Sequence, residues 1–199
     1  MKKLVFEGAE ARTYLTEFLG KKAIEKKRNP KKYRQKELDE KIRFNRARDE
    51  TNLMHKAKLA GVRTPAIYRI DRKKCIIVME LIKAKKMAQA VNSMKKKDFI
   101  ETGKQIALLH LNSIIHGDLT TNNLLIKKGK IFFIDFGLGF NSGKTEDCAV
   151  DLLGFKRTFL SSCPEKTVQW KQIEQGYKMK GKKEVLERML EVEKRARYL

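Results

Sequence analysis

The first 60 residues of the chain contain short apolar runs, followed by a long segment with helical spacing of its apolar positions. Residues 1–35 contain three apolar stretches separated by turn and charge signals, with Gly8 and Gly20 at the expected turns. This pattern predicts three strands. Residues 35–60 then place apolar side chains three and four positions apart, which predicts one long helix that ends at Gly61.

The remaining pattern predicts another hairpin and a mainly helical second half. Residues 66–70 and 75–79 are apolar runs on either side of a polar turn, as in a hairpin. Residues 83–93 are polar and do not alternate, which is typical of a connector with a short helix. The elements expected after this connector are a helix at 99–111, a hairpin of 124–126 and 131–134, and helices at 147–161, 165–177 and 184–197.

This order of elements predicts an α+β fold with two lobes. We expect an N-terminal lobe, residues 1–82, that contains a small sheet and the long helix. The C-terminal lobe, residues 83–199, is expected to be helical. With 199 residues and a hydrophobic content of 41%, the chain can bury a sizeable core.

Charge is the strongest bias in the composition. The 46 Lys and Arg against 24 Asp and Glu give a net charge of +22 at pH 7, which favours polyanionic partners such as nucleic acid. A lysine-rich cytosolic surface with no such partner would have the same composition. No apolar run approaches the roughly 20 residues of a membrane span, and Glu7 comes too early for a secretory signal. We therefore expect a cytoplasmic protein without a membrane partner.

The three cysteines do not indicate a chemical role. Cys75, Cys148 and Cys163 have no metal-ligand spacing, and their odd number fits a reducing compartment better than a disulfide framework.

The chemically most informative residues lie at 116–123 and 135–137. The first segment, HGDLTTNN, has the form H-x-D-x4-N, and the second is DFG, with a predicted hairpin between them. The joint pattern resembles the catalytic and metal-binding loops of the protein-kinase superfamily, although DFG alone would indicate only a turn. Phosphoryl transfer needs a carboxylate beside the attacking hydroxyl and oxygen ligands for Mg²⁺. We predict that Asp118 is catalytic and that Asn123 and Asp135 bind Mg²⁺ and the ATP phosphates.

A kinase-like site also needs a lysine on the third strand and a glutamate on the following helix. Lys26 ends an apolar stretch and Glu50 lies on the predicted long helix, so this pair is expected to hold the α- and β-phosphates of ATP. Because lysine is abundant, spacing alone leaves Lys22 and Lys27 as alternatives to Lys26.

Two further segments are expected to contact ATP. The turn expected to cover the phosphates is Gly8, Ala9, Glu10 and Ala11. With one glycine it departs from the G-x-G-x-x-G of ordinary protein kinases, so its backbone amides should approach the phosphates less closely. The segment expected to bind adenine follows a buried strand and contains Met79, Glu80 and Ile82.

Several other polar residues have structural interpretations. We expect His116 to pack near Phe136 and to bond the backbone, and His55 and His110 to be ordinary core or surface histidines. Asp151 has two interpretations, a brace for the backbone of the catalytic loop or an acidic residue at a helix N-terminus.

Taken together, these segments resemble the KEOPS-complex atypical protein kinase family over almost the whole chain. The segments that carry the resemblance are 8–11 (GAEA), 26–28 (KKR), 31–34 (KKYR), 38–39 (LD), 61–65 (GVRTP), 116–123 and 149–152 (AVDL). Alignment on Tyr33-Arg34 selects Lys26 as the family's lysine. Asn122 and Cys148 depart from the residues that are common in the family, serine and lysine.

The resemblance implies a minimal protein-kinase-like fold and a serine/threonine-kinase-like ATPase that uses ATP and Mg²⁺. It also implies a role in threonylcarbamoyladenosine modification of tRNA. The implied partners are the threonylcarbamoyltransferase subunit at the C-terminal lobe and basic tail (194–199), a small subunit at the N-terminal lobe, and tRNA. Only 13 residues separate Gly137 from Asp151, without an A-P-E element, so a general peptide kinase is not expected.

Two other functions fit parts of the sequence. A small-molecule kinase of the aminoglycoside-phosphotransferase type shares H-G-D-x4-N, but the chain is too short for the substrate-binding insertion of such enzymes. A non-catalytic kinase-like scaffold would use the basic surface to bind RNA or a partner. Degenerate catalytic positions would favour the scaffold, and the sequence does not show them.

Overall fold

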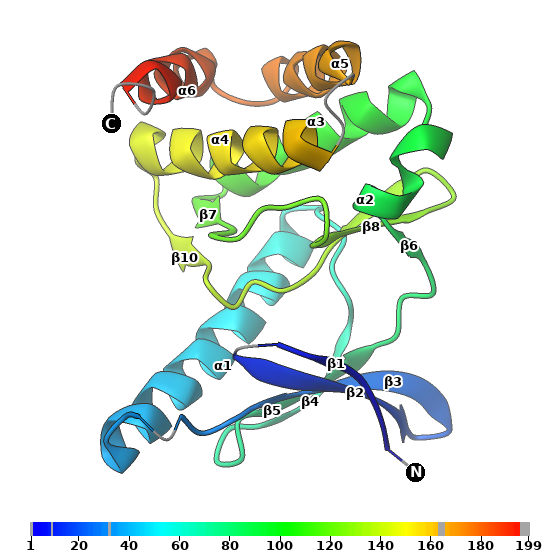
Figure 1. Cartoon of the computed structure of the whole chain (residues 1–199), viewed down its shortest axis with the longest axis vertical. Coiled ribbons are helices and arrows are strands. Elements are labelled where there is room, and N and C mark those ends of the chain that lie inside the picture. The colour runs from blue at the N-terminus through cyan, green and yellow to red at the C-terminus, as the bar shows by residue number, and fades with distance from the viewer. Residues whose placement is uncertain (1, 9, 32, 163–165, 196–199) are drawn as a thin grey trace.

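A computed structural model of the chain describes residues 2–8, 10–31, 33–162 and 166–195. A sheet with one long helix forms one end of the molecule, and a mainly helical body forms the other (Figure 1). The predicted α+β fold with two lobes is confirmed. The division of the chain after residue 82 stays a prediction, and the sheet of the first lobe ends at Glu80.

The sheet of the first lobe has five antiparallel strands in the order β1-β2-β3-β5-β4. The elements of this lobe are β1 (Lys3–Glu7), β2 (Ala11–Phe18), β3 (Lys21–Arg28), α1 (Lys36–Leu59), β4 (Ile67–Asp71) and β5 (Ile76–Glu80). They confirm the three predicted strands, the long helix and the hairpin. Leu19 and Gly20 have positive φ angles of 49° and 74°, as the tight turn between β2 and β3 requires.

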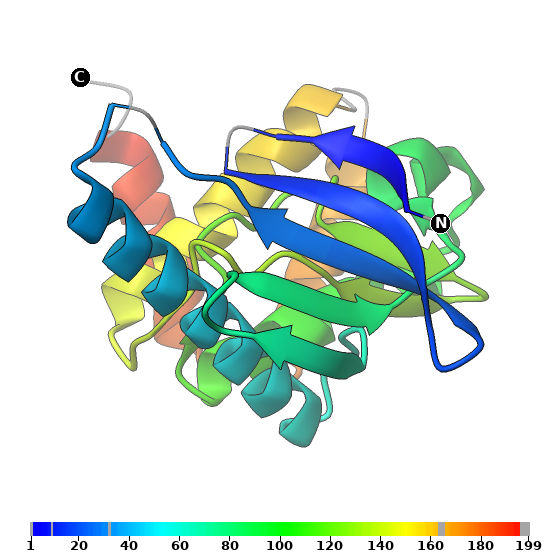
Figure 2. The ribbon, with the colours of Figure 1, turned by 90° about the horizontal axis from the view of Figure 1, so that it is seen from below.

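Helix α1 connects the two lobes. It crosses one face of the sheet and continues into the second lobe (Figures 1 and 2). Three side chains from its C-terminal half belong to the main buried core: Leu53, Met54 and Ala57. The predicted terminator Gly61 has a φ of +86°, and the Val62 N–H donates to the Ala57 carbonyl at 2.9 Å. Because α1 has buried residues in both lobes, a movement of one lobe would move the helix and, with it, the other lobe.

The second lobe contains helices, a hairpin of two four-residue strands and three strands of two residues each. Its elements are β6 (Lys85–Lys86), α2 (Met87–Ala90), a 3₁₀ turn (Val91–Ser93), α3 (Lys96–Leu111), β7 (Ile114–Ile115), β8 (Leu124–Lys127), β9 (Lys130–Phe133), β10 (Phe140–Asn141), α4 (Thr145–Ser162), α5 (Thr167–Lys178) and α6 (Lys183–Arg195). The predicted hairpin is β8–β9. The predicted first residues of α5 and last residues of the final helix lie outside the described residues. Among the described residues, no helix is long and apolar enough to cross a membrane.

Strands β6, β7 and β10 were not predicted. Each has two residues, which is too short for a hydrophobic period to be visible. Their partners lie far along the chain: β6 pairs with β8, and β7 pairs with β10. Tertiary pairing therefore creates these strands.

Helices α3 and α5 approach each other through two glycines. A Cβ on Gly103 would lie 1.9 Å from the Ile173 carbonyl oxygen, and a Cβ on Gly176 would lie 1.9 Å from the Ile100 carbonyl oxygen. Real side chains do not tolerate such contacts. The two glycines therefore determine how closely α5 packs on α3.

We predict that Gly103→Ala lowers the free energy of unfolding by about 2 kcal/mol because the added methyl group forces α3 and α5 apart. The matched control is Gly154→Ala on the exposed side of α4, where a Cβ would meet nothing within 4 Å. That variant should gain about 1 kcal/mol from helix propensity. Urea denaturation measures both, and equal effects of the two substitutions would contradict the packing argument.

Candidate active site

Asp151 on α4 holds the backbone of the loop that carries the H-x-D-x4-N motif. The buried Asp151 carboxylate accepts hydrogen bonds from the backbone N–H of His116 at 3.1 Å and of Gly117 at 2.9 Å. The His110 Nε2–H also donates to it at 3.2 Å, and His110 Nδ1 forms a hydrogen bond with the Tyr177 hydroxyl at 2.8 Å. Of the two interpretations of Asp151, the structure supports the brace.

Electrostatics fit this role of Asp151. Burial acts to raise the pKa of its carboxyl group, but hydrogen bonds and the neighbouring histidines hold that pKa below its ordinary value. Asp151 is therefore ionised, and an ionised carboxylate accepts stronger hydrogen bonds from the loop. His110 supports the same group, a role that sequence reasoning missed because α3 and α4 meet only in the tertiary structure.

His116 has the structural role predicted for it. Its ring is fully buried, 4.5 Å between centroids from the ring of Phe136, and its Nε2–H donates to the Ile134 carbonyl at 3.1 Å. Burial lowers the pKa of His116, so the ring is neutral. His116 thus packs the catalytic loop against the segment that contains Asp135.

Asp118, Asn123 and Asp135 come from two loops that the structure joins. The Asn123 side-chain amide donates to the Asp118 carboxylate at 2.9 Å and to the Asp118 carbonyl at 2.8 Å. The Ile134 N–H donates to the Asn123 carbonyl at 3.0 Å, which places the residue before Asp135 beside the first loop. Asp118 and Asp135 are both exposed, so water or a ligand can reach their carboxylates.

Lys26 connects the sheet to this centre. Its Nζ lies 2.7 Å from the Glu50 carboxylate on α1 and 2.7 Å from the Asp135 carboxylate. Burial acts to lower the pKa of Lys26, but Glu50 and Asp135 outweigh burial and raise it. Lys26 also helps to lower the pKa of Asp135, against the effect of burial. The two alternatives, Lys22 and Lys27, are both exposed, whereas Lys26 is buried.

Arg28 belongs to the same cluster, and sequence reasoning missed it. Its Nη2 is 2.5 Å from the second oxygen of Glu50, and its side chain is only 3% exposed. A Cβ on Gly137 would lie 2.8 Å from the same Nη2, so the guanidinium group packs against the DFG turn. The available signal was its position two residues after Lys26, on the same face of β3.

The turn between β1 and β2 is tied to α1. The Gly8 N–H donates to the Ala11 carbonyl at 3.0 Å, and Glu10 forms an ion pair with Arg46 of α1. Ala11 is buried, and Ala9 lies outside the described residues. A movement of α1, which carries Glu50, would therefore also move this turn.

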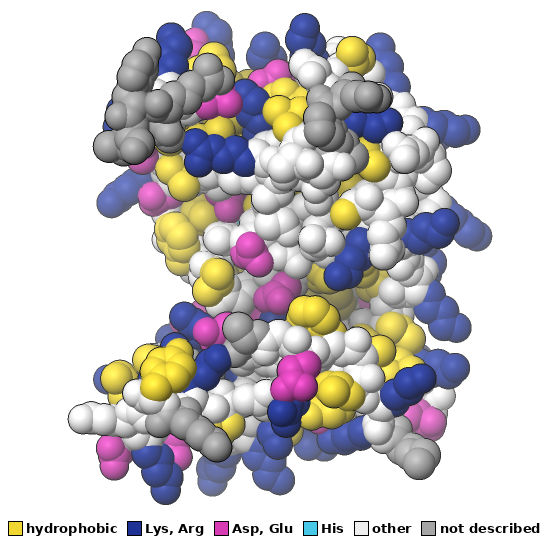
Figure 3. All heavy atoms as spheres, in the orientation of Figure 1, with side chains coloured by type: hydrophobic (Ala, Val, Ile, Leu, Met, Phe, Trp, Pro, Cys, Tyr) yellow, Lys and Arg dark blue, Asp and Glu magenta, His cyan; other side chains and the backbone are white. Residues whose placement is uncertain are grey.

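The segment expected to bind adenine begins at the end of β5. Met79 and Ile82 are both buried, and Glu80 is partly buried. The Glu80 N–H donates to the Ala66 carbonyl at 2.8 Å, so this N–H is already paired within the N-terminal lobe. Figure 3 shows that the surface is hollowed between the two lobes.

The residues present fit a magnesium ion better than a transition metal. Mg²⁺ is usually held by one or two carboxylates together with substrate phosphates and water. Asn123 and Asp135 offer only oxygen atoms as ligands, as Mg²⁺ prefers. Among the described residues there is no group of three or more His, Cys, Asp and Glu that could hold a metal ion.

The described cysteines are poor nucleophiles. Cys75 and Cys148 are buried free thiols, and burial raises the pKa of both, that of Cys148 to about 11. Cys163 lies outside the described residues. His55 is exposed on α1, as predicted for an ordinary histidine.

Comparisons with known proteins show the family of the chain. A family model described as the RIO domain matches residues 11–144. The chain is 36% identical to the KEOPS complex subunit Bud32 of Pyrococcus abyssi, over 98% of this chain and 96% of that protein. It is 35% identical to the EKC/KEOPS complex subunit bud32 of Dictyostelium discoideum, over 98% of this chain and 82% of that protein.

Longer relatives match as well. The chain is 41% identical to a probable bifunctional tRNA threonylcarbamoyladenosine biosynthesis protein of Methanosphaera stadtmanae, over 97% of this chain but 36% of that protein. It therefore spans about a third of the length of the bifunctional relatives.

Solved structures show the fold. The chain aligns with a Rio2 kinase from Chaetomium thermophilum, crystallised as an ADP/Mg²⁺-phosphoaspartate complex, with a TM-score of 0.67 and 16% identity. That alignment covers 98% of this chain and 70% of the other. The structure of WaaP in complex with acyl carrier protein aligns with a TM-score of 0.68 and 17% identity, over 98% and 87% of the two chains. These alignments confirm a protein-kinase-like fold.

We predict that Asp151→Asn loosens the catalytic loop and lowers the free energy of unfolding by about 1–3 kcal/mol, because an amide cannot accept all three hydrogen bonds. Hydrogen exchange should show faster exchange at the amides of His116 and Gly117. The control Asp49→Asn removes an exposed carboxylate and should leave both quantities unchanged. Unaltered protection of these two amides in Asp151→Asn would rule out the brace.

Proposed function

The chain belongs to the RIO-domain family that includes the KEOPS complex subunit Bud32, and we propose that it is an ATP-dependent, serine/threonine-kinase-like ATPase of that complex. Its role is to support threonylcarbamoyladenosine modification of tRNA in the cytoplasm. The observation that carries the proposal is the cluster in which Lys26 contacts both Glu50 and Asp135, beside the Asp118–Asn123 pair. This cluster contains the groups that phosphoryl transfer requires.

In this proposal the N-terminal lobe binds ATP. The carbonyl of Glu80 and the backbone of Ile82 hold adenine, Met79 packs beside the ring, and the turn at 8–11 covers the phosphates. Lys26 binds the α- and β-phosphates while Glu50 fixes the direction of its side chain. With ATP and magnesium bound, Lys26 would contact phosphate in place of Asp135, and Asp135 would be free to hold the metal ion.

The C-terminal lobe supplies the chemistry. Asn123 and Asp135 would hold magnesium, which would supply positive charge to neutralise the phosphates. Asp118 accepts the proton of the attacking water or hydroxyl as the new bond to phosphorus forms and the bond to the β-phosphate oxygen breaks. The hydrogen bond from Asn123 holds the Asp118 carboxylate in place for this role.

The segment after the DFG turn favours ATP hydrolysis over phosphorylation of peptides. Phe140 and Asn141 pair with Ile115 and Ile114, and the Ser142 N–H donates to the Ser113 carbonyl at 2.9 Å. This pairing holds residues 138–142 on the catalytic loop, and α4 begins at Thr145. Little chain remains to form a docking surface for a peptide.

Family relatives support the proposed partners. Bifunctional relatives join a region like this chain to almost twice as much additional chain, so we propose that the threonylcarbamoyltransferase subunit corresponds to that additional part. It would bind the C-terminal lobe and tail, of which residues 196–199 lie outside the described residues. The small subunit would bind the N-terminal lobe at β1, an edge strand whose apolar side chains are exposed: Leu4, Val5 and Phe6. The third partner is tRNA.

We predict that Asp118→Asn and Asp135→Asn each reduce magnesium-dependent ATP turnover by about 100-fold or more, because one loses the proton acceptor and the other a magnesium ligand. Turnover is measured by phosphate release, for the chain alone and with the transferase subunit and tRNA. Asp49→Asn, which changes an exposed carboxylate outside the cluster, should retain wild-type turnover. If wild type and variants are equally inactive in every mixture, the non-catalytic scaffold replaces the enzyme.

Lysine variants test how ATP is held. We predict that Lys26→Met weakens binding of magnesium-ATP by about tenfold or more, because the variant loses a charged phosphate contact. Lys22→Met changes an exposed lysine four residues away on β3, and this variant should bind like wild type. Calorimetry with ADP and with adenosine separates the two binding regions, since adenosine lacks phosphates. Equal losses with both ligands would show that Lys26 supports the fold and not the phosphates.

A further inference from the structure

Positive charge gathers at one edge of the second lobe. Residues 83–97 contain six lysines, residues 127–130 contain three, and neither segment contains Asp or Glu. We call these two segments the lysine edge. Eight of the nine lysines are exposed, and the ninth, Lys86, is partly buried. Among the described residues, none of the nine forms an ion pair.

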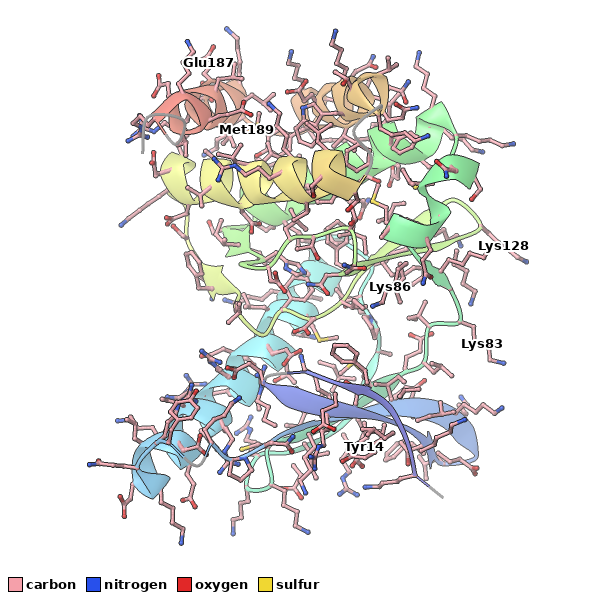
Figure 4. The ribbon with its side chains drawn as sticks, in the orientation of Figure 1. Tyr14, Lys83, Lys86, Lys128, Glu187 and Met189 are labelled. Atoms are coloured by element: carbon pink, nitrogen blue, oxygen red, sulfur yellow. The ribbon has the colours of Figure 1, made fainter. Side chains whose placement is uncertain are left out.

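The fold brings the two segments of the lysine edge together. Lys85 and Lys86 form β6, which pairs with Ile126 and Leu125 of β8. At the other end, a Cβ on Gly129 would lie 3.1 Å from an oxygen of Asp98, so the β8–β9 turn contacts the first turn of α3. Figure 4 shows Lys83 and Lys128 on the same side of the molecule, and Figure 3 shows Lys and Arg side chains along that side.

Two placements within the lysine edge are unfavourable for the fold itself. Lys95, Lys96 and Lys97 stand at the start of α3, where the helix dipole is already positive and acidic residues are preferred. Lys127 and Lys130 face each other directly across the β8–β9 ladder, and like charges at such positions repel. Asp98 is the only acidic residue in the first turn of α3; its carboxylate accepts the Lys95 N–H as in a capping box, and it stands beside three lysines. Local conflicts of this kind are expected at functional surfaces.

We infer that the lysine edge binds the phosphate backbone of tRNA. The inference rests on the proposed function, and it goes further by assigning the RNA contact to one surface. Lysine ammonium groups act as point charges on phosphates and do not read bases, so contact with a double-stranded stem is expected, without sequence preference.

The composition of the lysine edge disfavours other polyanions. A membrane-binding surface adds exposed large apolar side chains to its lysines, and the lysine edge shows none among the described residues. Protein interfaces are depleted in lysine and enriched in arginine and aromatic residues, whereas this surface has lysine and no arginine. An RNA backbone fits both observations.

The test uses a variant that should not harm the fold. Lys96→Glu and Lys97→Glu place acidic residues at the start of α3, and Lys130→Glu creates an attractive pair with Lys127. The triple variant should therefore unfold at the same urea concentration as wild type or a higher one. The control Lys22→Glu, Lys41→Glu and Lys171→Glu changes the net charge equally at three exposed lysines outside the lysine edge.

Binding of a labelled tRNA transcript to the whole chain is measured by fluorescence anisotropy over a range of salt concentrations, without ATP. We expect the lysine-edge triple to raise Kd at least about tenfold and to reduce the slope of log K against log salt by about three. The dispersed control should change Kd by less than about threefold, because it removes charge without removing phosphate contacts.

Two results would overturn the inference. The first is equal weakening in both triples, which would assign RNA binding to net charge alone. The second is unchanged tRNA binding in the lysine-edge triple; if that variant also loses binding to polyglutamate or phosphatidylserine vesicles, the surface binds another polyanion. ATP turnover of the chain alone should be normal in the lysine-edge triple. Failure of the inferred tRNA contact is thereby distinguished from failure of the proposed ATPase activity. The Asp118→Asn variant tests the ATPase activity.

Discussion

The buried carboxylate of Glu50 is the group on which the geometry of the site depends. Its two oxygens are shared between Lys26 and Arg28 of β3, and Lys26 extends the network to Asp135. A charge removed from water destabilises the fold by several kcal/mol unless it is paired. Two cations and two carboxylates balance here only when the sheet, α1 and the DFG turn meet at one point. The pairing requirement therefore positions both lobes around the site.

A second buried carboxylate, that of Asp151, positions the catalytic loop, as the Glu50 carboxylate positions the sheet. Asp151 holds the backbone on either side of the His116–Gly117 peptide, and Gly117 leaves room for the Leu138 carbonyl, which a Cβ would approach to 2.2 Å. The segment after the DFG turn lies on that loop through the β7–β10 pair. The catalytic loop is thus held by a side-chain carboxylate and the segment after the DFG turn by backbone pairing, both from within the chain.

Charged side chains have different surroundings in the interior and on the surface of the molecule. Inside, the cations near the site have carboxylate partners at hydrogen-bonding distance. Outside, the net charge of +22 is concentrated in segments such as the lysine edge, where lysines stand at a helix start and opposite each other on a hairpin. The interior balance serves the fold and the nucleotide, whereas the surface excess destabilises the fold slightly and favours a polyanionic partner.

The sequence by itself determined the order of helices and strands and the motif residues Asp118, Asn123 and Asp135, because hydrophobic periods and motif spacings are local properties of a chain. Their roles in catalysis stay predictions. Only the tertiary structure showed that Lys26, and not Lys22 or Lys27, contacts Glu50, and only it created the two-residue strands. The tertiary structure also showed that Arg28 contacts Glu50 and that Asp151 braces the backbone of the catalytic loop. Each depends on contacts between segments far apart in sequence, and no local pattern records such contacts.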